Sequence, residues 1–142
     1  MPPAELAIEV FRNRQRTSTK NGILKAEAVV RFLEVLKKSG VEYFQDVDKI
    51  VADEYFEFQI KKIPGQSSGI ALKYFFMLAG RNEFIKPDRM IIRFLQSVTG
   101  KTHTLAECQS ILTGVTEQLK ASGYVVSPKE LDNLIWNYQR LQ

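Results

Sequence analysis

The residues with the clearest chemical potential lie between Lys61 and Phe94. A Pro64-Gly65 turn separates two helical patterns, and Asp88 stands at the predicted start of the next helix. A tight turn at helix ends can offer backbone N–H groups to a phosphate. A carboxylate at a helix start is held ionised by the helix dipole, and in a cleft it could stabilise positive charge or activate a nucleophile. Together these features predict DNA binding, and beyond it chemistry on DNA.

The composition is that of a globular protein. The 142 residues favour one domain over residues 1–142, and 44% hydrophobic with 25% charged residues is ordinary for such a domain. No apolar run approaches the roughly 18–20 residues that a membrane helix needs, and residues 1–20 do not have the pattern of a secretory signal. We therefore expect a cytoplasmic protein without membrane association. The net charge of +4 permits a nucleic-acid partner without demanding one.

Cysteine and histidine occur once each, which limits the metal chemistry. Cys108 alone excludes an internal disulfide and any zinc or iron–sulfur site built from cysteines of this chain. His103 precedes a predicted helix and is expected to be exposed and inert, whereas Cys108 is expected to be buried. A metal site would need carboxylates alone, and no tight cluster is evident, so we expect neither a metal nor a cofactor.

The hydrophobic pattern is helical almost throughout. Thr104 with Glu107 and Ser127 with Glu130 form two capping boxes, each of which opens a helix. Strand-like stretches are too short to build a sheet. The sequence predicts an all-α domain of about six to seven helices. Helical segments are expected over residues 4–14, 21–39, 46–52, 54–62, 67–79, 89–98, 104–121 and 128–140, with strand-like stretches at 41–44 and 124–126.

On these residues the chain resembles the helix-hairpin-helix DNA glycosylase superfamily, which has the endonuclease III-like fold. The resemblance is carried by Ile63-Pro64-Gly65 with Ala71, and then by Pro87-Asp88 at the head of an apolar helix. It covers most of the chain, although its specific motifs are confined to residues 61–94. It implies a helix-hairpin-helix over 54–79 and a helix over 88–98 that is led by the catalytic aspartate.

The resemblance also implies site residues and a partner. In the family, backbone amides of the hairpin hold a phosphate of duplex DNA, and an aspartate acts on the sugar once the target base has been flipped out. Asp88 matches that aspartate. The implied activity is that of a monofunctional DNA N-glycosylase in base excision. By position, the phosphate cradle would comprise Gly65, Gln66, Ser67 and Gly69, with added positive charge from Lys61, Lys62 and Lys73.

Three departures from the family pattern bear on the reaction. Ser67 stands where the family hairpin has its second glycine. Gly69 stands where bifunctional members carry the lysine that forms a Schiff base, so strand cleavage by that route is not expected. Family residues that precede the equivalent of Ala4 complete one lobe of the cleft. Those residues have no counterpart here, which leaves three alternatives. The chain is a fragment; or a partner chain or a second copy completes the cleft; or the catalytic function is absent.

Simpler interpretations stay open beside these. Pro64-Gly65 could be only a turn between helices, and Asp88 only an N-cap that stabilises its helix by about 1 kcal/mol. The chain would then be a non-catalytic DNA-binding module or a helical protein-interaction domain. The densest basic run could be a solvated surface or could contact phosphates beside the hairpin. That run consists of Arg12, Arg14, Arg16 and Lys20.

Overall fold

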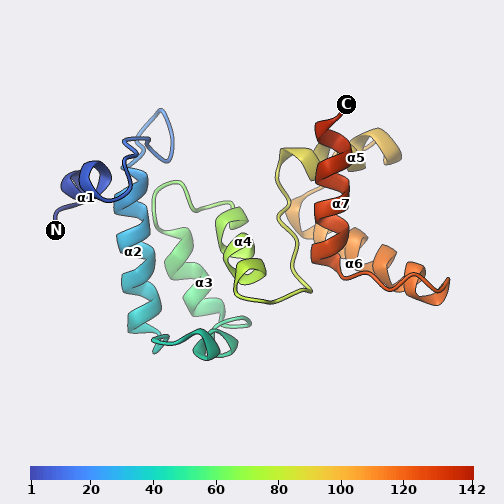
Figure 1. Cartoon of the computed structure of the whole chain (residues 1–142), viewed down its shortest axis with the longest axis horizontal. Helices are drawn as coiled ribbons and strands as arrows, with labels where there is room; N and C mark the ends of the chain where they lie inside the picture. The colour runs from blue at the N-terminus through green and yellow to red at the C-terminus, as the bar shows by residue number, and fades with distance from the viewer. The chain divides into compact units, whose positions relative to one another are not determined.

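The computed structural model describes all 142 residues, and its regular elements are helices (Figure 1). The all-α prediction is therefore confirmed. The only extended pairing is an isolated bridge between Arg16 and Leu24. The elements are α1 (Pro3–Glu9), α2 (Lys25–Lys38), the 3₁₀ helix η1 (Phe44–Lys49), α3 (Glu54–Lys61), α4 (Ile70–Leu78), α5 (Arg89–Thr99), α6 (Leu105–Ala121) and α7 (Pro128–Arg140).

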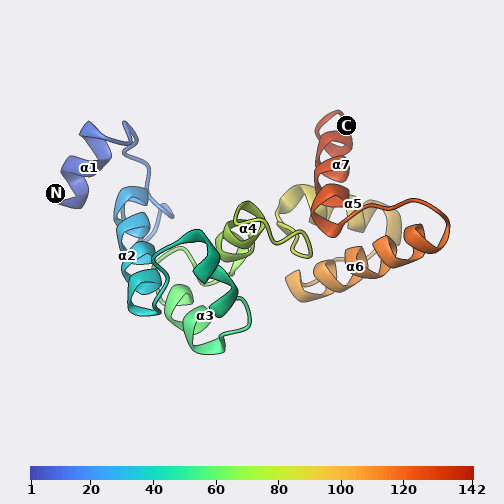
Figure 2. The ribbon, with the colours of Figure 1, turned by 60° about the horizontal axis from the view of Figure 1, so that its bottom comes forward.

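The contacts of the chain divide it into two compact units, Met1–Leu72 and Lys73–Gln142. In the first unit α2 packs against both α1 and α3. In the second unit α7 packs against both α5 and α6, as two views of the ribbon show (Figures 1 and 2). Helix α4 begins in the first unit and ends in the second. The expectation of one domain over 1–142 stays a prediction.

Each unit buries a set of apolar side chains. In the first unit Phe56 and Ile60 of α3 are fully buried. In the second unit one core cluster joins α5, α6 and α7 with the segment before α5, and it consists of Ile85, Ile91, Leu95, Cys108, Leu112 and Ile135. The prediction of a buried Cys108 is confirmed, and burial raises the pKa of its thiol.

Side-chain caps fix where the helices of the second unit begin. Asp88 is the N-cap of α5. Both predicted capping boxes are confirmed, with Thr104 and Glu107 at the start of α6 and Ser127 and Glu130 at the start of α7. Since these caps bond the first free N–H groups of each helix, they set its first residue from local sequence alone.

The connection between α1 and α2 differs from its prediction. Helix α1 is shorter than expected, because Arg12 has φ of 48° and so leaves the helical region. Helix α2 begins at Lys25 rather than Asn21, since Asn21 has φ of 58° and the Thr17 N–H donates to the Ile23 carbonyl at 2.9 Å. Residues 15–25 thus form a tight loop instead of the first turn of α2.

Candidate functional site

The turn between α3 and α4 contains all four residues of the predicted phosphate cradle. Gly65 has φ of 89°, a left-handed conformation that favours glycine. The Gln66 N–H donates to the Ile63 carbonyl at 2.9 Å, and the Gly69 N–H donates to the Gln66 carbonyl at 3.2 Å. Ser67 is exposed. Two of the four predicted cradle amides are therefore hydrogen-bonded within the chain.

The three lysines assigned to DNA each lie against another side chain. Lys61 Nζ is 2.7 Å from Glu57 Oε1, so its charge is partly offset. The Lys62 ammonium lies 4.3 Å from the centre of the Phe58 ring. Lys73, in the second unit, lies over the ring of Phe84 at 4.9 Å. The charge of Lys61 is thus shared with a carboxylate, whereas Lys62 and Lys73 each lie over an aromatic ring.

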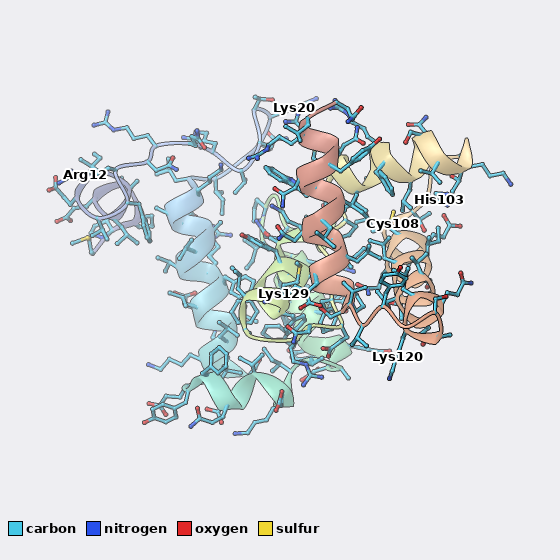
Figure 3. All side chains as sticks on the ribbon, turned by 45° about the vertical axis from the view of Figure 1, so that its right-hand side comes forward. Arg12, Lys20, His103, Cys108, Lys120 and Lys129 are labelled. Carbon is cyan, nitrogen blue, oxygen red and sulfur yellow. The ribbon has the colours of Figure 1, made fainter.

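The structure brings the basic run beside this turn. A Cβ atom built on Gly65 would lie 2.4 Å from Thr17 Cβ, so the loop between α1 and α2 rests directly on the turn. The basic side chains of that loop are exposed, whereas Thr17 is half-buried; Figure 3 labels Arg12 and Lys20. Glycine at position 65 therefore permits a basic loop and the turn to share one surface of the first unit. The exposed basic residues of the loop are Arg12, Arg14, Arg16 and Lys20.

The second unit contains an open pocket with a volume of about 550 Å³. Asp88 lies in its wall, and so does a second aspartate, Asp132, which the sequence analysis did not single out. The pocket also has two aromatic residues, Tyr74 and Trp136, and it combines acidic, basic and amide groups. Its remaining lining residues are Met77, Leu78, Asn82, Lys86, Lys129, Glu130 and Asn133.

Asp88 combines a capping role with a place at the pocket. Its Oδ1 accepts the N–H of Met90 at 2.9 Å and that of Ile91 at 3.3 Å. Its Oδ2 lies 4.0 Å from Lys86 Nζ. The cap and the pocket are compatible, because the two oxygens of the carboxylate face different groups.

Asp132 is buried on α7, and its Oδ2 accepts the backbone N–H of Lys86 at 2.6 Å. Burial raises the pKa of Asp132 to about 6, the bond from Lys86 opposes that rise, and the negative charge of Asp88 adds to it. This carboxyl group therefore titrates close to neutral pH, as acid–base groups of active sites often do. Its position within a polar stretch of α7 offers no sequence signal for this.

Two lysines flank the carboxylates. The Lys86 ammonium lies over the Tyr74 ring at 4.4 Å, and Lys129 Nζ donates to the Met77 carbonyl at 3.0 Å. The Lys129 N–H also donates to the Asn82 carbonyl at 3.0 Å. Lys129 thereby joins the start of α7 to the end of α4 and the turn that follows it.

A comparison with protein families decides to which group the chain is related. The family described as "Domain of unknown function (DUF8548)" matches residues 2–140. The chain belongs to this family. No curated protein and no solved structure matches the chain. Because the match runs through both units, the DUF8548 domain comprises the basic loop and the turn as well as the pocket.

The lone histidine of the DUF8548 chain lies apart from the lining of this pocket. The prediction of an exposed His103 is wrong, because the residue is half-buried. Its Nε2 lies 2.9 Å from Thr99 Oγ1, and its Nδ1 lies 3.8 Å from Glu107 Oε2. It lies between α5 and α6, one residue before the N-cap Thr104, and is labelled in Figure 3. No group of three or more His, Cys, Asp and Glu side chains is placed to hold a metal ion. None of the helices is both long and apolar enough to cross a membrane.

Proposed function

We propose that the chain binds duplex DNA and removes a base from it as a monofunctional N-glycosylase, with Asp88 as the catalytic carboxylate. One observation supports this above all: the aspartate that the resemblance singles out lines a pocket together with a second aspartate, Asp132. The pocket volume of about 550 Å³ lies within the roughly 300–1,000 Å³ of small-molecule sites. Tyr74 and Trp136 provide aromatic rings against which a flipped base would stack.

The reaction is hydrolysis of the bond between the sugar C1′ and the base. The electron pair of that bond leaves with the base, positive charge develops on the sugar, and the base ends with the proton that the attacking water loses. The Asp88 carboxylate stabilises this charge, or it takes a proton from the water whose oxygen forms the new bond to C1′. Asp88 is held in place for either role by the N–H groups of Met90 and Ile91.

The basic loop of the first unit supports DNA as the partner. Thr17 of this loop lies against Gly65 of the α3–α4 turn, and the four exposed cations stand on either side of Thr17 in the sequence, so the loop offers positive charge to phosphates next to the backbone of the turn. Since the Gln66 and Gly69 amides are bonded internally, the side chains of this loop supply most of the affinity. The proposed DNA-binding surface thus differs from the hairpin of the glycosylase superfamily, in which backbone amides hold the phosphate.

Asp88→Asn tests the catalytic assignment, because it keeps an oxygen for the cap and removes the charge. Duplex oligonucleotides that each carry one damaged or mismatched base are incubated with either protein, and abasic sites are revealed by alkaline cleavage. We expect Asp88→Asn to abolish excision while DNA affinity stays within twofold. Glu117→Gln, on the exposed face of α6, is the matched control and should excise normally. Excision by Asp88→Asn at the normal rate contradicts the assignment, and DNA binding without excision by any form indicates a non-catalytic module.

A protein-interaction domain is the second candidate, and exposed aromatic side chains in the first unit favour it. Tyr55 and Phe58 lie three residues apart on α3 and are 70% and 55% exposed. Tyr43 and Phe44, at the start of η1, are exposed by 63% and 67%. Aromatic residues are enriched at protein interfaces. This candidate predicts no DNA binding at low salt, and self-association in sedimentation velocity that Tyr55→Ser with Phe58→Ser abolishes.

A further inference from the structure

The segment between α4 and α5 is held by side chains from two other helices. Gln109 of α6 accepts the N–H of Ile85 at 3.0 Å and donates to the Glu83 carbonyl at 2.8 Å. Asp132 of α7 accepts the next N–H along the chain, that of Lys86, at 2.6 Å. Ile85 is itself fully buried. The segment is thus fixed by one apolar anchor and two polar tethers.

The two tethers differ in charge. The neutral amide of Gln109 accepts a backbone N–H, and asparagine at position 132 could do the same. A buried carboxylate loses hydration that an amide would lose at a smaller cost. Holding the segment therefore does not require the negative charge of Asp132. A further role for that charge lies in the pocket, which Asp132 lines.

A short path connects this tether to Asp88. The Asp88 N–H donates to the Lys86 carbonyl at 2.7 Å, which closes a tight turn around the buried Pro87. Lys86 Nζ lies 4.0 Å from Asp88 Oδ2. The position of the Lys86 backbone therefore determines the position of the Asp88 carboxylate in the pocket wall.

We propose that Asp132 is a positioning residue for Asp88, which it holds through the N–H of Lys86, and that it adds a further negative charge to the pocket. The use of this pocket rests on the proposed function. The other charged groups of the lining are Lys86 and Asp88 before and at the start of α5, and Lys129 and Glu130 on α7. The lining side chains from α4 are Tyr74, Met77 and Leu78, and none of them has a charge at neutral pH. Ionised Asp132 therefore strengthens the preference of the pocket for a positively charged sugar in the transition state.

The tether is tested by following backbone amide signals in a ¹H–¹⁵N correlation spectrum as the pH is varied from 4.5 to 8. We expect the Lys86 signal to shift with a midpoint near 6, the pKa of Asp132. In Asp132→Asn the Lys86 signal keeps its low-field position but no longer shifts with this midpoint. A Lys86 signal that does not respond to pH, or that shifts equally in Asp132→Asn, overturns the tether.

The effect on Asp88 is tested at the two amides that it caps. Asp132→Ala should speed hydrogen exchange at Met90 by ~10-fold or more, because the Asp88 carboxylate is no longer fixed, whereas Asp132→Asn should leave it within about twofold. Circular dichroism checks that both variants are folded. If Asp132→Ala does not fold, Asp132→Leu, which fills the space without the bond, takes its place. Unchanged exchange at Met90 in a folded variant without the bond overturns the positioning role.

Excision assays then separate this inference from the proposed function. With an active substrate, the single-turnover rate of the natural protein should rise through pH 6, and that of Asp132→Asn should be at least ~10-fold lower at pH 8 and lose this rise. Failure of the proposed function appears as no binding or excision of DNA while the Lys86 titration is intact. Failure of the inference appears as a Lys86 signal that does not titrate, or as unchanged hydrogen exchange at Met90 in folded Asp132→Ala, whatever the DNA assays give.

Discussion

The Asp132 carboxylate accepts a 2.6 Å hydrogen bond from the Lys86 backbone, although 46 residues separate the two in sequence. This bond connects α7 to the segment that carries Asp88. It also buries an acidic group in a unit whose other buried side chains, apart from Thr116, are apolar. The bond therefore couples stability, pH and the geometry of the pocket.

The stability of the fold should fall as the pH rises from about 4 to 6. Asp132 has a pKa of about 6 in the folded protein and about 3.8 when unfolded, so the folded state binds more protons in this window. The contribution is present below about pH 3.8 and is lost as the pH rises through 6, with a total loss of about 3 kcal/mol by about pH 7. Urea denaturation of Asp132→Asn should lack this loss, and the variant should be the more stable protein at pH 8. Equal stability of the two proteins at pH 8 would contradict the cost assigned to the buried charge.

Removing the cap of α5 should destabilise the second unit modestly. Asp88→Ala leaves the Met90 and Ile91 N–H groups without their acceptor, at a cost of about 1 kcal/mol. Asp88→Ser can still cap the helix and should stay within about 0.5 kcal/mol of the natural protein. Thermal unfolding should show a decrease of roughly 2–4 °C for Asp88→Ala. An equal decrease for both variants would mean that charge rather than the cap stabilises α5.

Gly65→Ala should destabilise the first unit more than Gly40→Ala. Both glycines have positive φ, of 89° and 76°, so alanine is strained by about 1 kcal/mol at either position. Only at Gly65 does the added Cβ meet another residue, since Thr17 Cβ would lie 2.4 Å away, whereas nothing lies within 4 Å at Gly40. We expect an additional cost of roughly 1–3 kcal/mol in urea denaturation. Equal costs would mean that the basic loop does not rest on the turn.

The basic loop should set the salt dependence of DNA binding. Arg14→Glu combined with Lys20→Glu removes two exposed cations, and the slope of log affinity against log salt should decrease in magnitude by about 2. Lys101→Glu with Lys120→Glu makes the same change in net charge on exposed residues of the second unit and serves as the matched control. Fluorescence anisotropy with a labelled duplex measures both. An equal loss of slope in the control would show that net charge, not this loop, determines binding.

Local sequence signals determined much of the fold. The positions of Asp88, Thr104 and Ser127 predict where α5, α6 and α7 begin, because an N-cap bonds groups only two or three residues away. The loop at Asn21 escaped prediction, because the left-handed conformation of Asn21 and the bridge between Arg16 and Leu24 depend on backbone pairing that a helical pattern cannot reveal. The sequence also predicted Asp88 as a site residue, on its place in a motif.

By itself, then, the sequence determined the helical class, the caps and a candidate aspartate. Only the tertiary structure placed Asp132 beside Asp88 and set Thr17 against Gly65. The physical reason is that both relationships join segments far apart in the chain. The pKa of Asp132 depends on desolvation and on a neighbouring charge, which exist only once α7 packs beside the segment that precedes α5.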